Sequence, residues 1–178
     1  MTNNQIITII SGSPRSNSNT IKVVNTYAQL IKNQDITYNI IDLANFPAEC
    51  LFNNQVMGIG NAELDKVVEE KIIPATHLVF VSPEYNGSYA GVIKTFIDGI
   101  KPEYFKAKKV GLVGVATGRA GNLRGMDHLQ ASLHYLGAYV APINLPVSVV
   151  HTLTNENEIH DQYTINALHQ HLNKLINF

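Results

Sequence analysis

The sequence predicts an α/β protein in which a parallel sheet carries helices on both faces. Short apolar runs rich in β-branched residues alternate with longer segments of helical periodicity, and five such β-then-α units follow one another. The apolar runs are continuous rather than alternating, which is typical of strands buried on both sides. Because parallel strands are joined by right-handed crossovers, each helix packs against a face of the sheet. We therefore expect one doubly wound sheet.

The elements can be assigned in order along the chain. The expected strands are residues 6–10, 36–41, 77–81, 110–116 and 139–143, with 147–150 as a further candidate for the fifth. The helical stripes are Ile21, Val24, Tyr27/Ala28 and Ile31; Leu64, Val67/Val68 and Ile72; Val92/Ile93, Phe96/Ile97 and Ile100; Met126, Leu129, Leu133 and Leu136; and Ile165, Leu168, Leu172 and Leu175. Five strands connected in this way are typical of a flavodoxin-like sheet with strand order 2-1-3-4-5. The segment from Phe46 to Asn61, with Gly58 and Gly60, is the least regular and is expected to be a loop near one end of the sheet.

Length and composition describe one globular domain over residues 1–178. Hydrophobic residues make up 45% and charged residues 15%, which excludes a disordered or collagen-like chain. A net charge of -1 gives no attraction to nucleic acid or to an anionic membrane. No run approaches the ~20 apolar residues that cross a bilayer, and the start lacks the basic region of a signal peptide. The single cysteine, Cys50, suits a reducing compartment, so we expect a cytoplasmic protein.

Ligands of open parallel sheets bind beyond the carboxyl ends of the strands, where the strand order reverses. The loop after the first strand, residues 11–20, is rich in hydroxyl side chains and runs into a helix. Its backbone N–H groups and the helix dipole attract an anion, and Arg15 adds a planar fork of donors suited to phosphate. The loop is neither a Walker A motif nor a Gly-x-Gly-x-x-Gly fingerprint. It indicates a phosphate site, with an ordinary Ser/Asn helix cap as the alternative.

The loop after the third strand, residues 82–89, has the features of a platform for a flat ring. Pro83 and Asn86-Gly87 impose a rigid bend, and Tyr85 offers an aromatic face. A turn that simply caps the next helix is the alternative.

The loop after the fourth strand, residues 114–125, is rich in glycine. Gly118, Gly121 and Gly125 are expected to let the backbone approach a ligand, with the hydroxyl of Thr117 facing the same crevice. Two arginines, Arg119 and Arg124, share this loop, and they are read as cofactor contacts, as solvated surface or as a subunit contact.

Three motifs, in this order and spacing, resemble the NADPH-dependent FMN reductase family, which includes enzymes described as quinone, azo-dye and chromate reductases. The motifs are GSPRSNSN at 12–19, PEYNGS at 83–88 and TGRAGNLRG at 117–125, and the resemblance extends from Ile6 to about Ile165. It implies FMN as cofactor and NADPH or NADH as co-substrate. Carried over residue by residue, it implies that the FMN phosphate is bound by Ser13, Arg15, Ser18, Asn19 and Thr20, that the isoalloxazine ring is lined by Pro83, Glu84, Tyr85, Asn86 and Gly87, and that Thr117 and Gly118 lie at its pyrimidine edge.

The function that this resemblance implies is an FMN-dependent NAD(P)H oxidoreductase. It would pass hydride from a nicotinamide to bound flavin and then to a quinone, a free flavin, an azo compound or a similar small-molecule acceptor. The flavin N5 carries the chemistry, so no catalytic side chain and no metal are expected. The family also implies a homodimer or homotetramer. Two alternatives remain at this point: a flavin-binding electron carrier without its own NAD(P)H oxidase activity, and a flavin-free binding module.

Other polar and reactive side chains are expected to have structural roles. Lys94 and Asp98, four residues apart, form a surface pair on a helix. His169 and His171 point to different faces of the last helix and are expected to be solvated. Cys50 is interpreted as a small apolar filler.

Overall fold

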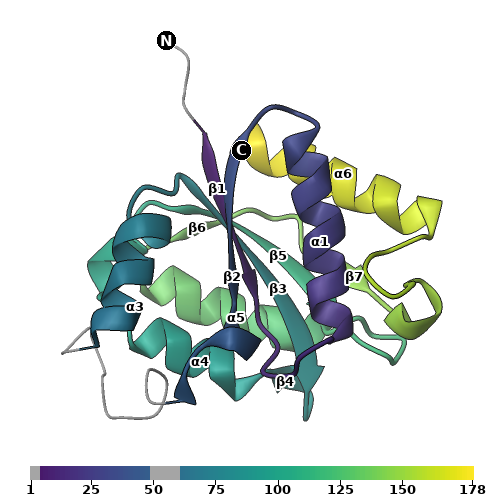
Figure 1. The fold of residues 1–178 in the computed structure, drawn as a ribbon, viewed down its shortest axis with the longest axis horizontal. Helices are drawn as coiled ribbons and strands as arrows, with labels where there is room; N and C mark the ends of the chain where they lie inside the picture. Colours follow the sequence, from purple (N-terminus) through teal and green to yellow (C-terminus); the bar gives the residue numbers. More distant parts are fainter. Residues whose placement is uncertain (1–4, 49–60) are drawn as a thin grey trace.

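The computed structural model describes residues 5–48 and 61–178 and has the predicted layered α/β architecture (Figure 1). The strands are β1 (Ile6–Ser11), β2 (Thr37–Asp42), β3 (His77–Tyr85), β4 (Ser88–Tyr89), β5 (Lys109–Val115), β6 (Tyr139–Val140) and β7 (Leu145–Val147). The helices are α1 (Asn19–Lys32), α3 (Ala62–Val67), α4 (Gly91–Asp98), α5 (Leu123–Tyr135) and α6 (Gln162–Ile176). Short helical turns are η1 (Leu43–Asn45), η2 (Val68–Ile72), η3 (Pro102–Tyr104) and η4 (Val150–Thr152).

The sheet confirms the predicted flavodoxin-like strand order. Its strands run β2-β1-β3-β5-β6, with β7 also paired to β5 and β4 paired to β3. Every pair is parallel except β3 with β4, which form a short antiparallel hairpin. The predicted fifth strand is divided into β6 and β7. Pro142 lies between them, and proline has no N–H to give to a ladder of hydrogen bonds.

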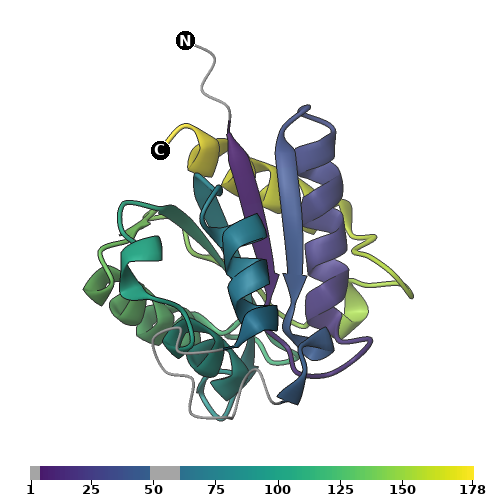
Figure 2. The ribbon, with the colours of Figure 1, turned by 60° about the vertical axis from the view of Figure 1, so that its left-hand side comes forward.

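Helices cover both faces of the sheet. In Figures 1 and 2, α1 and α6 lie on one side, while α3, α4 and α5 lie on the other. The side chains of β3 alternate between the two cores: Leu78 and Phe80 pack in the cluster with α3, α4 and α5, and Val79 and Val81 pack with α1 and α6. All four are fully buried, which explains why this strand reads as a continuous apolar run.

Two expectations about polar side chains have opposite outcomes. The pair on α4 is confirmed, because Lys94 Nζ lies 2.7 Å from Asp98 Oδ2. The prediction that His171 is solvated is wrong, whereas His169 is exposed as expected. His171 is only 3% exposed, and its Nδ1 lies 2.8 Å from the hydroxyl of Tyr27 on α1. Residues two positions apart point to opposite sides of a helix. Here the side that carries His171 faces the core and Gly111 of β5, which has no side chain.

Some predictions fall outside the described residues. They are the role of Cys50 and most of the loop expected between Phe46 and Asn61, since residues 49–60 are not described. Within residues 5–48 and 61–178, none of the helices has the length and apolar character needed to cross a membrane.

Candidate functional site

A cavity of about 380 Å³ opens beyond the carboxyl ends of β1, β3 and β5, where α1 begins. It is lined by Arg15, Asn19, Thr20, Pro83, Glu84, Asn86, Gly87, Val115, Ala116, Thr117, Gly118 and Val150. All but three of the residues predicted to bind a cofactor therefore line one cavity. The exceptions are Ser13, Ser18 and Tyr85. The cavity lies at the point where the strand order reverses, as expected for this class of sheet.

The loop between β1 and α1 is shaped by the residues that do not line the cavity. Gly12 N–H donates to the carbonyl of Val81 at 2.9 Å, which holds the loop against β3. Ser13 is buried, and its Oγ accepts a hydrogen bond from the backbone N–H of Arg15 at 3.2 Å. Ser18 is the N-cap of α1, and its Oγ accepts from Ile21 N–H at 3.3 Å. Each of these two hydroxyl groups accepts one bond from the backbone of the loop or of α1 and keeps its own proton to donate.

Arg15 is the cation of this cavity. Its side chain is exposed, and its guanidinium carbon lies 5.7 Å from the centre of the Tyr85 ring, within the range of a cation–π contact. The ion pairs found among the described residues join Lys66 to Glu70 and Lys94 to Asp98, so no described carboxylate forms an ion pair with Arg15, although Glu84 lines the same cavity. Its N–H donors are therefore available to an anion at the start of α1, where the positive end of the helix dipole adds to the attraction.

The β3–β4 hairpin forms the second wall. Asn86 and Gly87 both have positive φ angles, 51° and 74°, as a two-residue type I′ turn requires. Tyr85 pairs with Ser88 across this turn, so the bend predicted from the Asn-Gly dipeptide is confirmed. Tyr85 packs against the core beneath α4 and α5, and its ring contacts Arg15, which lines the cavity.

The loop after β5 forms the third wall, and it brings in a residue that the sequence did not indicate. Ala116 N–H donates to the carbonyl of Val147, and Val150 N–H donates to the carbonyl of Ala116. These bonds place Val150 of η4 on the cavity wall. Its neighbour Val149 has a φ of 51°, which is rare for a β-branched residue. No sequence signal marks Val150, because its position depends on backbone pairing between distant segments.

The glycines of this loop differ in role, and the expectation that all of them give the backbone access to a ligand is wrong for Gly121 and Gly125. A side chain at Gly118 would meet nothing within 4 Å. A Cβ at Gly121 would lie 2.5 Å from Pro146 Cβ, and a Cβ at Gly125 would overlap the side-chain oxygen of Asn122. Gly121 and Gly125 therefore allow close packing, and of the three only Gly118 faces open space.

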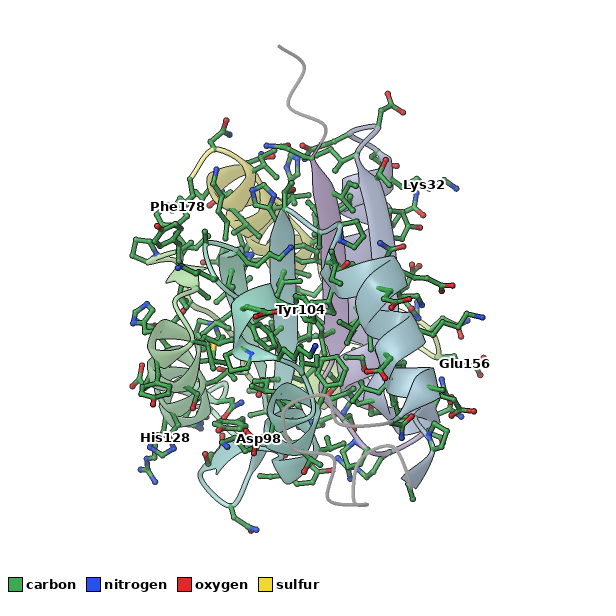
Figure 3. The ribbon with its side chains drawn as sticks, turned by 90° about the vertical axis from the view of Figure 1, so that its left-hand side faces the viewer. Lys32, Asp98, Tyr104, His128, Glu156 and Phe178 are labelled. Carbon is green, nitrogen blue, oxygen red and sulfur yellow. The ribbon has the colours of Figure 1, made fainter. Side chains whose placement is uncertain are left out.

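Asn122 was also missed as a structural residue of this loop. Its side chain is 1% exposed, and its Nδ2 donates to the carbonyl of Ser82 at 2.9 Å and to Ser82 Oγ at 3.2 Å. This contact fastens the start of α5 to the end of β3. Nearby, His128 Nδ1 lies 2.9 Å from Ser88 Oγ, which joins α5 to the hairpin as well. Figure 3 labels His128 at this end of the molecule.

Comparison with known proteins identifies the family. The family model for NADPH-dependent FMN reductase matches residues 6–151. The chain belongs to the NADPH-dependent FMN reductase family. An FMN-dependent NADPH-azoreductase from Staphylococcus aureus is 32% identical over 139 residues, which span 77% of this chain and 73% of that protein.

Solved structures agree on the fold of this FMN reductase family member. FerB, a flavoenzyme NAD(P)H:(acceptor) oxidoreductase from Paracoccus denitrificans, superposes with a TM-score of 0.76 at 18% identity, over 97% of this chain and 96% of its own. The NADH:FMN oxidoreductase EMOB superposes with a TM-score of 0.74 at 21% identity, over 98% of this chain and 90% of its own. A flavodoxin from Megasphaera elsdenii has a TM-score of 0.57 at 15% identity, over 93% of this chain and 96% of its own. These likenesses confirm the flavodoxin-like fold.

Membership of the FMN reductase family decides between the functional alternatives. The chain is an FMN-dependent NAD(P)H oxidoreductase rather than an electron carrier or a flavin-free module. The cavity residues fit the phosphate end of FMN, because an unpaired guanidinium and a helix N-terminus are the donors that a phosphate monoester needs.

Proposed function

We propose that the cavity at the start of α1 binds FMN and that the enzyme reduces a quinone, a free flavin or an azo compound there. The proposal rests on one observation: three loops far apart in the sequence bring most of their predicted cofactor residues to a single cavity. When bound, FMN supplies the centre that takes hydride from NAD(P)H and passes it to the acceptor. The residues of the chain bind FMN and orient it toward the molecules that exchange hydride with it.

The phosphate end of FMN is assigned to the start of α1. Arg15, Asn19 and Thr20 line the cavity there, and the first N–H groups of a helix have no partner within the helix. Arg15 supplies a full charge and two parallel donors, which hold a phosphate dianion more firmly than backbone groups alone. We assign Ser13 and Ser18 to the support of this loop, since their hydroxyl groups bond to its backbone.

The ring of FMN is assigned to the space between the hairpin and the loop after β5. The Asn86-Gly87 turn is rigid, so its backbone donors keep a constant position relative to a bound ring. Opposite the turn, Thr117 and Gly118 offer a hydroxyl group and an open stretch of backbone. Hydrogen-bond donors held in place in this way stabilise the negative charge that develops on the ring when it is reduced.

The acceptor is proposed to be a flat small molecule that reaches the exposed side of the cavity. Glu84, Asn86, Thr117 and Gly118 are exposed at its rim, so a second planar molecule can approach without a conformational change. The azoreductase from Staphylococcus aureus supports azo compounds as one acceptor class. Steady-state rates with an azo dye, a quinone and free FMN, each with NADPH and NADH, would rank these acceptors.

We also propose a homodimer or homotetramer in a reducing, cytoplasmic setting. A groove of about 470 Å³ between α4 and α5 supports self-association, because it is mostly apolar and is lined by Lys94, Ile97, Asp98, Ile100, Pro102, Ala131, Ser132, Tyr135 and Leu136. An apolar surface of this kind is typical of protein contacts. The single cysteine of the chain supports the reducing setting.

The phosphate assignment is tested by Arg15→Ala, with binding of FMN and of riboflavin measured by quenching of flavin fluorescence. Loss of a charged hydrogen-bonding partner is expected to weaken FMN by about 10- to 100-fold, at about 1.5–3 kcal/mol per charged hydrogen bond. Riboflavin has no phosphate, so its affinity should change little.

Arg119→Ala is the matched control, since Arg119 shares this end of the molecule but does not line the cavity. It should bind FMN as the unmodified protein does. Equal losses for FMN and riboflavin in Arg15→Ala would show that the α1 loop does not hold the phosphate.

A further inference from the structure

A second ligand site follows from the opposite end of the sheet. We propose that a cavity at the amino ends of β1, β3 and β5 binds a small molecule that carries phosphate groups. The cavity measures about 330 Å³ and is lined by Gln5, Ala75, Thr76, His77, Lys106, Ala107, Lys108 and Lys109. It shares no lining residue with the FMN cavity, which lies beyond the carboxyl ends of the same strands. In Figure 1 this end of the sheet is the end near the two chain termini.

The charge of this cavity is positive. Lys106, Lys108 and Lys109 contribute to its lining, and none of the described lining residues carries a carboxylate. No ion pair among the described residues involves these lysines. Three ammonium groups around one small cavity repel one another, and an anion between them removes that repulsion. Lysine binds phosphate as a point charge and does not need the geometry of a guanidinium fork.

Lys108 is held in place rather than extended into solvent. Its Nζ donates to the carbonyl of Ile73 at 2.7 Å and to the carbonyl of Ala75 at 2.5 Å. An ammonium group has three N–H donors, so one remains for a ligand after these two bonds. Burial lowers the pKa of Lys108, and the charge of a bound anion would counteract this effect. The site therefore has one preformed cationic donor before any ligand arrives.

His77 supplies an observation that is independent of the lysines. It is 2% exposed, and its Nε2 is buried without a hydrogen-bond partner in the part of the chain that the structure describes. Its Nδ1 lies 2.8 Å from Thr76 Oγ1. Burial and the charge of Lys109 lower the pKa of His77 to about 4, so the ring is neutral at pH 7. A buried ring nitrogen without a partner is costly. Nε2 is closed off from the cavity as well as from solvent, so a ligand would satisfy it only after the ring had turned toward the opening.

The hydrogen bonds around Thr76 show how His77 would act as a donor. Thr76 Oγ1 accepts from the backbone N–H of Ile6 at 3.0 Å, which leaves its own proton for either the carbonyl of Ile6 or the ring of His77. When the hydroxyl donates to Nδ1, the ring carries its proton on Nε2. Once the ring has turned toward the cavity, that tautomer would add a neutral N–H donor to the three lysines.

These features favour a compact ligand with several negative charges. Several cations and a neutral N–H donor match the oxygen atoms of a phosphate or diphosphate group. The volume lies at the small end of the range for ligand sites, about 300–1,000 Å³, which favours a compound smaller than a dinucleotide. The same chemistry is offered by an inorganic diphosphate and by the phosphate of a mononucleotide, so the test contains both.

The test uses the enzyme saturated with FMN, so that Arg15 is already occupied. Pyrophosphate, inorganic phosphate and 5′-AMP are titrated separately by calorimetry at low ionic strength, with FMN fluorescence recorded to detect displacement of the cofactor. We expect pyrophosphate to bind more tightly than phosphate without releasing FMN, and more weakly as salt is added. Tighter binding of 5′-AMP than of pyrophosphate would assign the site to a nucleotide, and the reverse would assign it to a free diphosphate. Both outcomes support a phosphate site.

Variants of the lining lysines locate the site. Lys106→Gln and Lys109→Gln are each expected to weaken pyrophosphate about two- to fivefold, the effect of one partly exposed charge. Lys32→Gln is the control, because Lys32 lies at the same end of the molecule in Figure 3, carries the same charge and does not line the cavity. His77→Phe removes the ring nitrogens while leaving all three lysines, and is expected to weaken binding about fivefold. No binding of any probe, equal affinity in Lys106→Gln, Lys109→Gln and the unmodified enzyme, or an equal loss in Lys32→Gln would overturn the proposal.

Discussion

Two buried histidines, His77 and His171, have pKa values well below the usual value for this residue. His171 on α6 lies against Tyr27 of α1, with ring centres 5.7 Å apart in an edge-on arrangement. Burial is the largest cause that lowers its pKa to about 4. The Tyr27 hydroxyl is deeply buried as well, and burial raises its pKa. Both side chains are therefore neutral across the physiological range and act as a hydrogen-bonded part of the core.

A pH dependence of stability follows from His171. In the unfolded chain the imidazole takes up a proton near pH 6.5, whereas in the folded protein it stays neutral down to about pH 4. Between these values the unfolded state binds more protons, so the free energy of unfolding falls as the pH falls. The loss is up to about 3 kcal/mol for His171, at about 1.4 kcal/mol per pKa unit. Urea unfolding at several pH values between 8 and 4.5 measures it.

His171→Gln separates this effect from other titrations. The variant should lose less stability than the unmodified protein over the same pH range, although part of the fall remains because His77 titrates in the same direction. His169→Gln is the matched control on the same helix, since His169 is exposed. A pH profile that is identical in His171→Gln and the unmodified protein would contradict a neutral, buried His171.

At the scale of elements, the start of α5 shows how one helix is positioned. Asn122 adopts a φ of 64° and bonds to Ser82, which fixes where α5 leaves the loop after β5. The absence of a side chain at Gly125 lets this asparagine fit beneath the first turn of the helix. The same turn carries Arg124, whose Nη1 comes within 3.0 Å of the Cβ position of Gly87 in the hairpin. The helix thus holds two walls of the proposed FMN cavity together.

Gly125→Ala tests this arrangement. The added methyl group would overlap Asn122 Oδ1 and lie 2.7 Å from the backbone carbon of Ser88, so the helix must shift. We expect a loss of about 1–3 kcal/mol in the free energy of unfolding, as for other overpacked sites. Thermal unfolding of the cofactor-free protein measures the change.

Gly118→Ala is the control for this substitution, because nothing lies within 4 Å of its Cβ position. Its stability should change by no more than about 0.5 kcal/mol. Similar losses in the two variants would mean that Gly125 has no special packing role.

At the scale of the whole molecule, exposed aromatic side chains lie on both sides of the sheet. Tyr135 at the end of α5 is 93% exposed and borders the apolar groove between α4 and α5. Tyr163 on α6 is 83% exposed on the other side of the sheet, where none of the described cavities includes it. The proposed contact between subunits therefore involves the α4–α5 side.

Tyr135→Glu is expected to weaken self-association. A charge placed in an apolar contact and the loss of an aromatic anchor together should raise the dissociation constant about tenfold or more. Sedimentation velocity over a range of protein concentrations measures it, and Tyr163→Glu is the matched control. The proposed subunit contact at α4 and α5 would be contradicted if the unmodified protein stayed monomeric at every concentration, or if the Tyr135→Glu variant associated normally.

The fold could be predicted almost completely, since its elements carry strong local signals. Continuous apolar strands and helical stripes such as Leu168, Leu172 and Leu175 arise from burial, which acts residue by residue. The division of the fifth strand was not predicted, although Pro142 is a local signal that would have indicated it. The burial of His171 was not predicted, because a spacing of two residues shows only that His169 and His171 point to different sides of α6. The packing of α6 on β5 decides which of these sides is buried.

By itself, the sequence determined the order of the strands and the loops that line the proposed cofactor cavity, because periodicity, the Asn86-Gly87 turn and the helix start beside Arg15 are short-range features. Only the tertiary structure decided that Val150 lines the proposed FMN cavity, that Asn122 fastens α5, and that lysines near His77 surround a second cavity. Such contacts join segments far apart in the chain, and their energy depends on distances that exist only once the sheet has formed.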